Sequence, residues 1–218
     1  RGGRRGEPVH RTHRNAIAIT VEMDHRMMRS APLGTSVMES SAQYLRSGIL
    51  ALKTARLIRS MGYEATAHID GNYEVICPLV AVDAGLGVIG RMGLLMTPEL
   101  GPRVRISVVT TDLPLLHSEP KPDPTTLHFC HYCRKCAEVC PVSAIPSGPR
   151  TEIDGVTRWQ INSEKCYHYW TVSGTDCGRC MSVCPYSHPD NLFHRLIRRG
   201  IKNNLLFRHL AIKLDDVF

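Results

Sequence analysis

Eight of the nine cysteines in this chain of 218 residues fall between Cys130 and Cys184, and their spacing suits iron-sulfur chemistry. The first run reads CxxCxxCxxxCP, and the second reads CxxCxxxCP with one more cysteine eleven residues ahead of it. A CxxCxxC loop is tight enough to bring three thiolates to three irons of one cubane, and in two-cluster ferredoxins the cysteine before proline binds the other cluster. This exchange predicts two 4Fe-4S clusters, one bound by Cys130, Cys133, Cys136 and Cys184, the other by Cys140, Cys166, Cys177 and Cys180.

Two other uses of cysteine fit this spacing less well. Zinc sites pair CxxC or Cys/His knuckles, and His131, His168 and His188 lie near the cysteines in sequence, but a double run followed by CP is a poor zinc pattern. We interpret these histidines as hydrogen-bond donors near the clusters or as surface residues. Disulfides are disfavoured because thiolate clusters need a reducing or anaerobic setting. Cys77 stands alone in an apolar segment and is predicted to be a buried thiol.

A glycine-rich segment also matches a binding motif. Gly85-x-Gly87-x-x-Gly90 has the form of the dinucleotide fingerprint, and Asp112 lies where a ribose-binding acid would be sought. That fingerprint requires a long helix straight after the glycines, so that the helix N-terminus can receive the pyrophosphate. Residues 91–103 contain two glycines and two prolines, which argues against such a helix. We expect instead a sharp turn, or backbone lying close to something flat or bulky.

The elements that position these residues mix strands and helices. Short apolar or alternating runs predict strands at residues 15–22, 65–69 and 104–111, and apolar residues at helical spacing predict a helix over 37–61. Residues 78–84 form a short apolar piece before the glycines. This order predicts an α/β or α+β layer domain in the first part of the chain.

The second part of the chain has a different character. Residues 114–124 contain four prolines and are predicted to be a linker. Residues 129–189 lack regular periodicity and cannot build an apolar core, so the cysteines must hold this segment together. Residues 191–218 predict an amphipathic helical tail that caps the domain, with docking to a partner or an anionic bilayer as alternatives. Its apolar face carries Leu192, Phe193, Leu196, Ile197 and Ile201, and its basic face Arg195, Arg198, Arg199 and Lys202.

Composition excludes several classes of protein. The chain has 43% hydrophobic residues, which excludes a disordered chain, and no run of 18 apolar residues, which excludes a membrane span. With 27 Lys and Arg against 20 Asp and Glu the net charge is +7, and only 6% of residues are aromatic, so nucleic-acid binding is not indicated. The chain begins with Arg1 and is interpreted as a fragment or processed form, cytoplasmic or peripheral at a membrane; an export signal would lie upstream. The basic excess lies at the two ends, in Arg1, Arg4, Arg5, Arg11, Arg14 and in Arg195, Arg198, Arg199, Lys202, Arg208 and Lys213.

Taken in order, several segments resemble the corrinoid iron-sulfur reductive dehalogenases. They are GYEATAH, PLVAVDAGLGVIGRMGLLMTPELGPRVR, VTTDLPL, FCHYCRKCAEVCP and GTDCGRCMSVCPYSHP. The chain is similar, more distantly, to epoxyqueuosine reductase. The resemblance implies an α+β protein corresponding to the C-terminal portion of the catalytic subunit. Its parts would be a partial nitroreductase-like domain binding base-off cobalamin (1–118), a two-cluster ferredoxin-like domain (119–190) and the basic amphipathic tail (191–218).

The resemblance also implies catalytic and cofactor-binding residues. In these dehalogenases a tyrosine donates a proton and a nearby Arg or Lys lowers its pKa; Tyr44 and Arg103 match these positions best, with Arg105 as the second choice. In epoxyqueuosine reductase an aspartate is the donor, and Asp70 lies about where it would fall. Val88 departs from the Glu that many dehalogenases carry in this stretch, which leaves the substrate open. Residues expected at the corrinoid are Gly85, Gly87, Gly90 and Arg91.

The function implied is reductive dehalogenation of a small organohalide, with the two clusters passing single electrons to a corrinoid. A low-potential donor such as ferredoxin or flavodoxin would supply the electrons, and the basic C-terminal helix would dock a partner or a membrane surface. Two alternatives stay open. One is an epoxyqueuosine reductase-like enzyme acting on tRNA, although the helical repeat tail of that enzyme is absent here. The other is an electron-transfer module without a corrinoid.

Overall fold

Three antiparallel strands form the main sheet of the protein. The computed structural model describes residues 13–117 and 124–215, so Arg1, Arg4, Arg5, Arg11 and the middle of the predicted linker lie outside the described residues. The strands β1 (Asn15–Glu22), β5 (Val104–Thr111) and β2 (Ala65–His68) pair in the order β1-β5-β2. All three are the strands expected from the sequence, β2 ending one residue early. With the helices around them, they confirm a mixed α and β protein.

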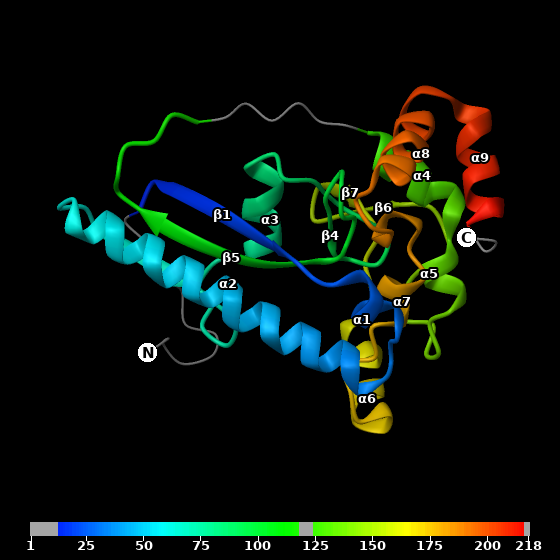
Figure 1. Ribbon diagram of the computed structural model, residues 1–218, viewed down its shortest axis with the longest axis horizontal. Helices are drawn as coiled ribbons and strands as arrows, with labels where there is room; N and C mark the ends of the chain where they lie inside the picture. Colours follow the sequence, from blue (N-terminus) through cyan, green and yellow to red (C-terminus); the bar gives the residue numbers. More distant parts are fainter. Residues whose placement is uncertain (1–12, 118–123, 216–218) are drawn as a thin grey trace.

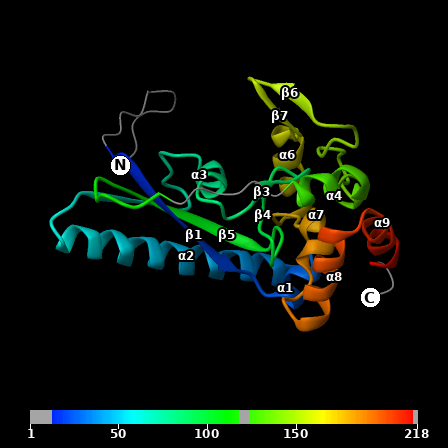
Figure 2. The same cartoon turned by 90° about the horizontal axis from the view of Figure 1, so that it is seen from above.

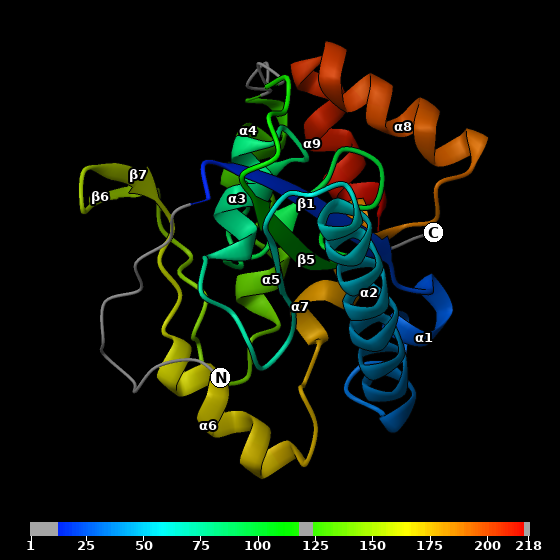
Figure 3. The same cartoon turned by 90° about the vertical axis from the view of Figure 1, so that its left-hand side faces the viewer.

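The central strand β5 is covered on both of its faces. Val108 and Val109 are fully buried, as their β-branched side chains suit a strand inside a layer. In the register of the sheet, Thr111 pairs with Asn15 on one side and Ala65 on the other. Figures 1 and 3 show the long helix α2 (Gly34–Ser60) on one face and the short helix α3 (Cys77–Asp83) on the other.

Helix α2 packs on the sheet through small residues. A Cβ added at Gly48 would be in ordinary contact with Ile69, 3.8 Å away, and Ser107 Oγ donates a hydrogen bond to Ser47 O. These small side chains let the helix axis approach the sheet closely. Apart from Ile58, most large apolar residues of the helix are exposed instead: Leu45 is 67% exposed. The apolar layer between helix and sheet is made by Ala51, Ala55, Ile58, Ala65 and Val109.

A short hairpin begins inside the glycine-rich segment that follows α3. Its strands are β3 (Val88–Ile89), which lies between Gly87 and Gly90, and β4 (Leu95–Met96), so the chain forms a hairpin here rather than the long helix that the dinucleotide fingerprint requires. This is the sharp turn expected from the sequence. The hairpin lies between the sheet and the cysteine segment (Figure 2).

The cysteine segment consists of short elements joined by irregular chain. Arg134 has a left-handed backbone (φ 55°), which separates the first two helices and sets the direction of the cysteine loop. The N-cap Asn162 accepts a hydrogen bond from Lys165 N at the start of the longest helix of this segment. The elements are α4 (Thr125–Cys133), α5 (Lys135–Glu138), β6 (Thr151–Ile153), β7 (Val156–Arg158), α6 (Ser163–Ser173), α7 (Arg179–Ser182) and the 3-10 turn η1 (Pro185–Ser187).

The C-terminal tail forms two helices rather than one. Asn204 separates α8 (Leu192–Asn203) from α9 (Leu205–Leu214), and its side chain accepts hydrogen bonds from the first amides of α9. Both helices lie against α4 (Figures 1 and 2). Ile201 is 2% exposed and joins Phe129, Met96 and Tyr186 in one core. Within the described ranges, no helix combines the length and the apolar character needed to cross a membrane.

Candidate functional site

The first cysteine quartet surrounds one small cavity. Cys130 and Cys133 lie one turn apart on α4, Cys136 follows on α5, and Cys184 comes from the loop before η1. All four line a cavity of about 20 Å³. Residues three apart on a helix share a face, which is why the CxxC spacing brings two thiols to the same point.

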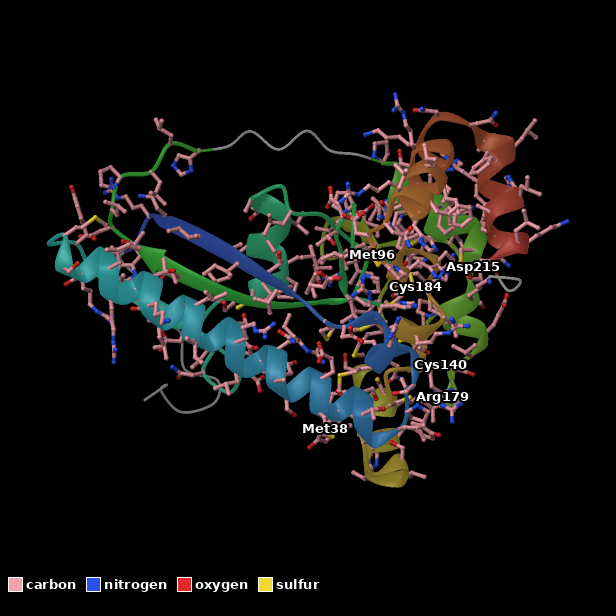
Figure 4. All side chains as sticks on the ribbon, viewed as in Figure 1. Met38, Met96, Cys140, Arg179, Cys184 and Asp215 are labelled. Atoms are coloured by element: carbon pink, nitrogen blue, oxygen red, sulfur yellow. The ribbon has the colours of Figure 1, made fainter. Side chains whose placement is uncertain are left out.

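The second quartet gathers beside the first. Cys166 lies on α6 and Cys180 on α7, while Cys177 has a left-handed backbone (φ 48°) that turns its side chain toward them. Burial raises the pKa of Cys180 to about 12, and the nearby thiols of Cys166, Cys177 and Cys140 add to the shift. Figure 4 shows Cys140 and Cys184 in the part of the molecule formed by the cysteine segment. The structure therefore groups the eight cysteines as the exchange predicts; that they bind clusters stays a prediction.

The thiols are buried in a way that suits metal binding. Burial raises the pKa of Cys133 and of Cys136 to about 12, so each would be protonated in neutral solution without a cation. Iron bound to the sulfur would remove the proton outright. Among the described residues no three His, Cys, Asp or Glu side chains lie close enough to share one metal ion. Thiolates of a cubane each bind a different iron, so all-sulfur quartets of this kind fit a cluster.

Arg91 anchors the loops around the first quartet. Its guanidinium is 1% exposed and donates hydrogen bonds to the carbonyl oxygens of Cys130, His131, Pro146 and Gly148. Its Cζ also lies 4.6 Å from the ring centre of Trp159. The resemblance implies that Arg91 binds a corrinoid, whereas in the structure its donors hold backbone beside Cys130. A corrinoid-binding role for Arg91 stays a prediction.

The glycines of the GLGVIG segment allow protein backbone to approach. A Cβ at Gly87 would lie 2.2 Å from the carbonyl oxygen of Met96, and one at Gly90 would lie 2.6 Å from Met96 Cγ and 3.7 Å from Cys130 Sγ. Gly85 takes a positive φ of 79°, which favours glycine. The bulky neighbour expected from the sequence is thus the chain itself at β4. Cofactor binding by these three glycines stays a prediction.

A second, larger cavity lies between the sheet and the cysteine segment. Its volume is about 320 Å³, and Tyr44 and Arg105 meet at its wall, with Arg105 Cζ 4.4 Å from the centre of the Tyr44 ring. Burial raises the pKa of Tyr44 and the charge of Arg105 opposes this, with a net upward shift. Arg105 also forms an ion pair with Asp176, 3.6 Å away, and donates to Ser40 Oγ. The other lining residues are Tyr73, Val75, Ile76, Cys77, Pro78, Leu94, Leu95, Pro102, Val104, Ile106 and Met181.

Arg103, the first choice as partner of Tyr44, lies elsewhere. It is fully buried, and its guanidinium donates to the carbonyl oxygens of Ser187 and Met23 and to Glu22 Oε1. Two residues of a strand span roughly 7 Å, so Arg103 reaches the loop after Cys184 while Arg105 reaches Tyr44. Arg105, the second choice, and not Arg103 therefore lies beside Tyr44. A catalytic role for Arg103 stays a prediction.

Sequence reasoning missed one aromatic residue of this cavity. Tyr73 lines it, and its hydroxyl donates to Asp70 Oδ1 at 3.4 Å. Burial and the charge of Asp70 raise the pKa of Tyr73 strongly. Asp70 itself is exposed and does not line the cavity. Tyr73 lies in an irregular loop without periodicity, and its closeness to Asp70 in sequence was the available signal.

Cys77 is buried, as predicted, and also lines the cavity.

Comparisons with known proteins agree with this geometry. Residues 129–188 match the model of a 4Fe-4S dicluster domain. The chain is 35% identical over 212 residues to the tetrachloroethene reductive dehalogenase of Sulfurospirillum multivorans, covering 94% of this chain and 42% of that protein. It is 32% identical over 216 residues to the enzyme of that name from Desulfitobacterium hafniense, covering 94% of this chain and 38% of the relative.

Solved structures give the same result. A catabolic reductive dehalogenase in complex with 3-bromo-4-hydroxybenzoic acid superposes with a TM-score of 0.89 at 31% identity, covering 97% of this chain and 31% of that one. An epoxyqueuosine reductase with a tRNA stem loop shares the fold alone, with a TM-score of 0.55 at 20% identity, over 81% of this chain and 49% of that one. The chain spans less than half the length of the curated relatives that it matches. It belongs to the reductive dehalogenase family, as a chain equivalent to part of those longer proteins.

Proposed function

We propose that this chain supplies the electron path and part of the catalytic cavity of a reductive dehalogenase that acts on a small organohalide. Two 4Fe-4S clusters in the cysteine quartets would pass single electrons toward a corrinoid. One observation carries the proposal: Met181, which follows Cys180 on α7, lines the cavity that also holds the Tyr44 and Arg105 pair. The cysteine segment and the cavity are therefore in direct contact, as electron delivery to a bound reactant requires.

The division of the chain belongs to the same proposal. Residues 1–118 would form part of a nitroreductase-like corrinoid domain, 119–190 the ferredoxin-like domain and 191–218 the basic tail. One solved relative is described in terms of B12-dependent dehalogenation, which supports cobalamin here. The cofactor would supply a cobalt centre that reduces carbon-halogen bonds. The apolar residues around the 320 Å³ cavity, among them Ile76 and Leu94, fit a flat apolar ring system, and the acid-base pair lies among them.

Tyr44 is proposed as the proton donor. Its raised pKa keeps the phenol protonated near neutral pH, so Oη holds a proton beside the cavity. When the reactant takes two electrons and loses halide, the new C–H bond needs that proton, and Arg105 stabilises the phenolate that remains. Asp176 and Ser40 fix Arg105 against the ring. The mostly apolar lining of the cavity limits competing protonation by water.

Replacing Tyr44 by Phe in the full-length protein tests this assignment. We expect dehalogenation to fall at least a hundredfold, which is the usual worth of a positioned general acid, with iron and cobalt contents unchanged. Ser41→Ala, on the same helix, serves as the control. Turnover by Tyr44→Phe at the wild-type rate would exclude Tyr44 as donor.

The dehalogenase function is favoured over the two alternatives. The match to an epoxyqueuosine reductase of Staphylococcus aureus covers 49% of this chain at 29% identity, against 94% at 35% for the dehalogenase. Asp70, the donor in that alternative, is exposed and bonded to Tyr73. Extraction of iron and sulfide without cobalt from the full-length protein would favour the electron-transfer module instead. A location in the cytoplasm or at a membrane face stays a prediction.

A further inference from the structure

Helix α8 turns its basic side toward a broad hollow beside α4. The hollow has a volume of about 440 Å³ and takes four basic side chains from α8, against the two acidic residues Asp190 and Glu99. We call it the basic hollow. Its remaining walls come from Pro98, Tyr186 and the first residues of α4, Thr125 and Thr126. The four basic side chains are Arg195, Arg198, Arg199 and Lys202.

The positive charge of the basic hollow is only partly compensated. Asp190 accepts hydrogen bonds from both Arg195 and Arg198, so one carboxylate serves two guanidinium groups. Arg198 Nη1 is buried and has no hydrogen-bond partner. Arg199 is exposed and makes no ion pair with any described residue. The hollow therefore presents unpaired donors and a net positive charge, which suits an anionic surface.

The basic hollow is also one residue away from the first cysteine quartet. Tyr186 lines both the hollow and the cavity that holds Cys130, Cys133, Cys136 and Cys184. Its ring centre lies 5.2 Å from that of Phe129, the neighbour of Cys130. Thr126, at the wall of the hollow, precedes Cys130 by one helical turn. A redox group brought to the hollow would thus be separated from the quartet by the thickness of residues such as Tyr186.

We propose that the basic hollow is the docking site of an acidic, one-electron carrier protein that reduces the cluster of the first quartet. This inference rests on the proposed function, which requires an external source of electrons. In each encounter the carrier would lose one electron and the cluster would gain one, with no proton or bond exchanged. Opposite charge steers such partners together quickly, and complexes of electron carriers bury little surface, so a charged hollow of this size suffices.

The test uses the full-length protein with its cofactors, and compares two electron sources. Reduced flavodoxin represents the acidic carrier, and titanium(III) citrate represents a small reductant that needs no docking site. For Arg199→Glu we expect the ratio of the flavodoxin-driven to the titanium-driven rate to fall about tenfold at low salt, with a flatter dependence on ionic strength. Arg56→Glu, an exposed arginine on α2, is the matched control and should keep the wild-type ratio.

Two results would contradict the proposed docking site. An unchanged ratio in Arg199→Glu would overturn it. So would a variant that loses binding to vesicles of anionic phospholipid while keeping the ratio, because the hollow would then be a membrane contact. If the wild-type protein does not dehalogenate with titanium(III), the proposed function fails. Docking is then judged from bleaching of cluster absorbance by reduced flavodoxin, which must be slower in Arg199→Glu than in Arg56→Glu.

Discussion

The sheet half of the chain, residues 13–117, and the cluster half, residues 124–215, are held together by different interactions. In the sheet half, one long helix and three paired strands enclose an apolar layer that includes Ala55, Ile58 and Val109. In the cluster half the helices that carry cysteines are four to eleven residues long. Its core includes Cys136 and Cys184, with Cys133 and Cys140 packed against it, and it also takes in Met92 and Met96 from the sheet half.

Two buried arginines of the sheet half stabilise the irregular loops of the cluster half. Arg91 donates to four carbonyl oxygens around the first quartet, and Arg103 donates to the carbonyl oxygen of Ser187 after Cys184. Irregular chain has carbonyl groups that no helix or strand satisfies, and burying them unpaired is costly. The sheet half thus provides a regular frame whose arginines fix the loops that carry the ligands. We expect the cluster half to depend on its clusters and on Arg91, and the sheet half to depend on neither.

Loss of one ligand should break the cluster half most strongly. In Cys184→Ala we expect loss of the cluster shared with Cys130, Cys133 and Cys136, and hence of about half of the protein-bound iron. Iron analysis with electron paramagnetic resonance of the reduced protein measures this. Cys77→Ala removes a cysteine of the sheet half and should keep both clusters. Loss confined to the cluster bound by Cys166, Cys177 and Cys180 would refute the exchange of ligands.

The arginine anchors provide the next test. Arg91→Met leaves buried carbonyl oxygens without donors, and we expect it to destabilise the cluster half by about 3 kcal/mol. Hydrogen exchange should quicken at the amides of α4 and stay unchanged at those of β5. Arg150→Met is the matched control, because Arg150 also lies over Trp159, at 5.6 Å, but is exposed. Equal effects of the two substitutions would show that contact with Trp159 matters, and the carbonyl bonds do not.

A pair of glycines sharpens the comparison further. At Gly90 an added Cβ would lie 2.6 Å from buried Met96, so we expect Gly90→Ala to cost about 2 kcal/mol through overpacking. At Gly48, inside α2, the nearest atoms are 3.8 Å away, and Ala should stabilise the helix by about 0.7 kcal/mol. Thermal unfolding of both variants measures the two effects. A stabilising Gly90→Ala would mean that the hairpin beside Cys130 is loosely packed.

Sequence predicted the sheet half well because its signals are local. Each strand or helix there is specified by residues close to it in sequence: β-branched runs form β1 and β5, and a glycine ends α2. The predicted ends of these elements therefore lie close to the observed ones. The face of α2 that packs on the sheet did not follow from its sequence pattern. Its apolar residues predict a core face, yet the helix buries small residues such as Ser47 and Gly48 because they let it approach the sheet. The distance between a helix and the sheet depends on both elements, and the sequence pattern of the helix alone carries no information about the sheet.

For the candidate site, too, local patterns were predictive and contacts between distant elements were not. Cysteine spacing predicted which thiols gather, since the iron-sulfur geometry constrains the chain over short distances. Which arginine faces Tyr44 depends on where β5 passes α2, and two candidates two residues apart carry the same local signal. Tyr73 was missed because its loop has no periodicity and its role comes from the cavity that other elements enclose.

The smallest expected effect concerns how α9 is attached to the cluster half. Burial raises the pKa of Asp215, but hydrogen bonds from His188 at 2.9 Å and Lys135 at 2.7 Å outweigh it and hold the pKa below its ordinary value. A lowered carboxyl pKa stabilises the folded state above the unfolded pKa, and this stability is lost as pH falls through the folded value. Asp215→Asn should therefore weaken protection of the α9 amides by about 1 kcal/mol at pH 7, and the difference from wild type should shrink only below about pH 4. A difference that persists unchanged into strong acid would assign the effect to packing of α9 rather than to the charge of Asp215.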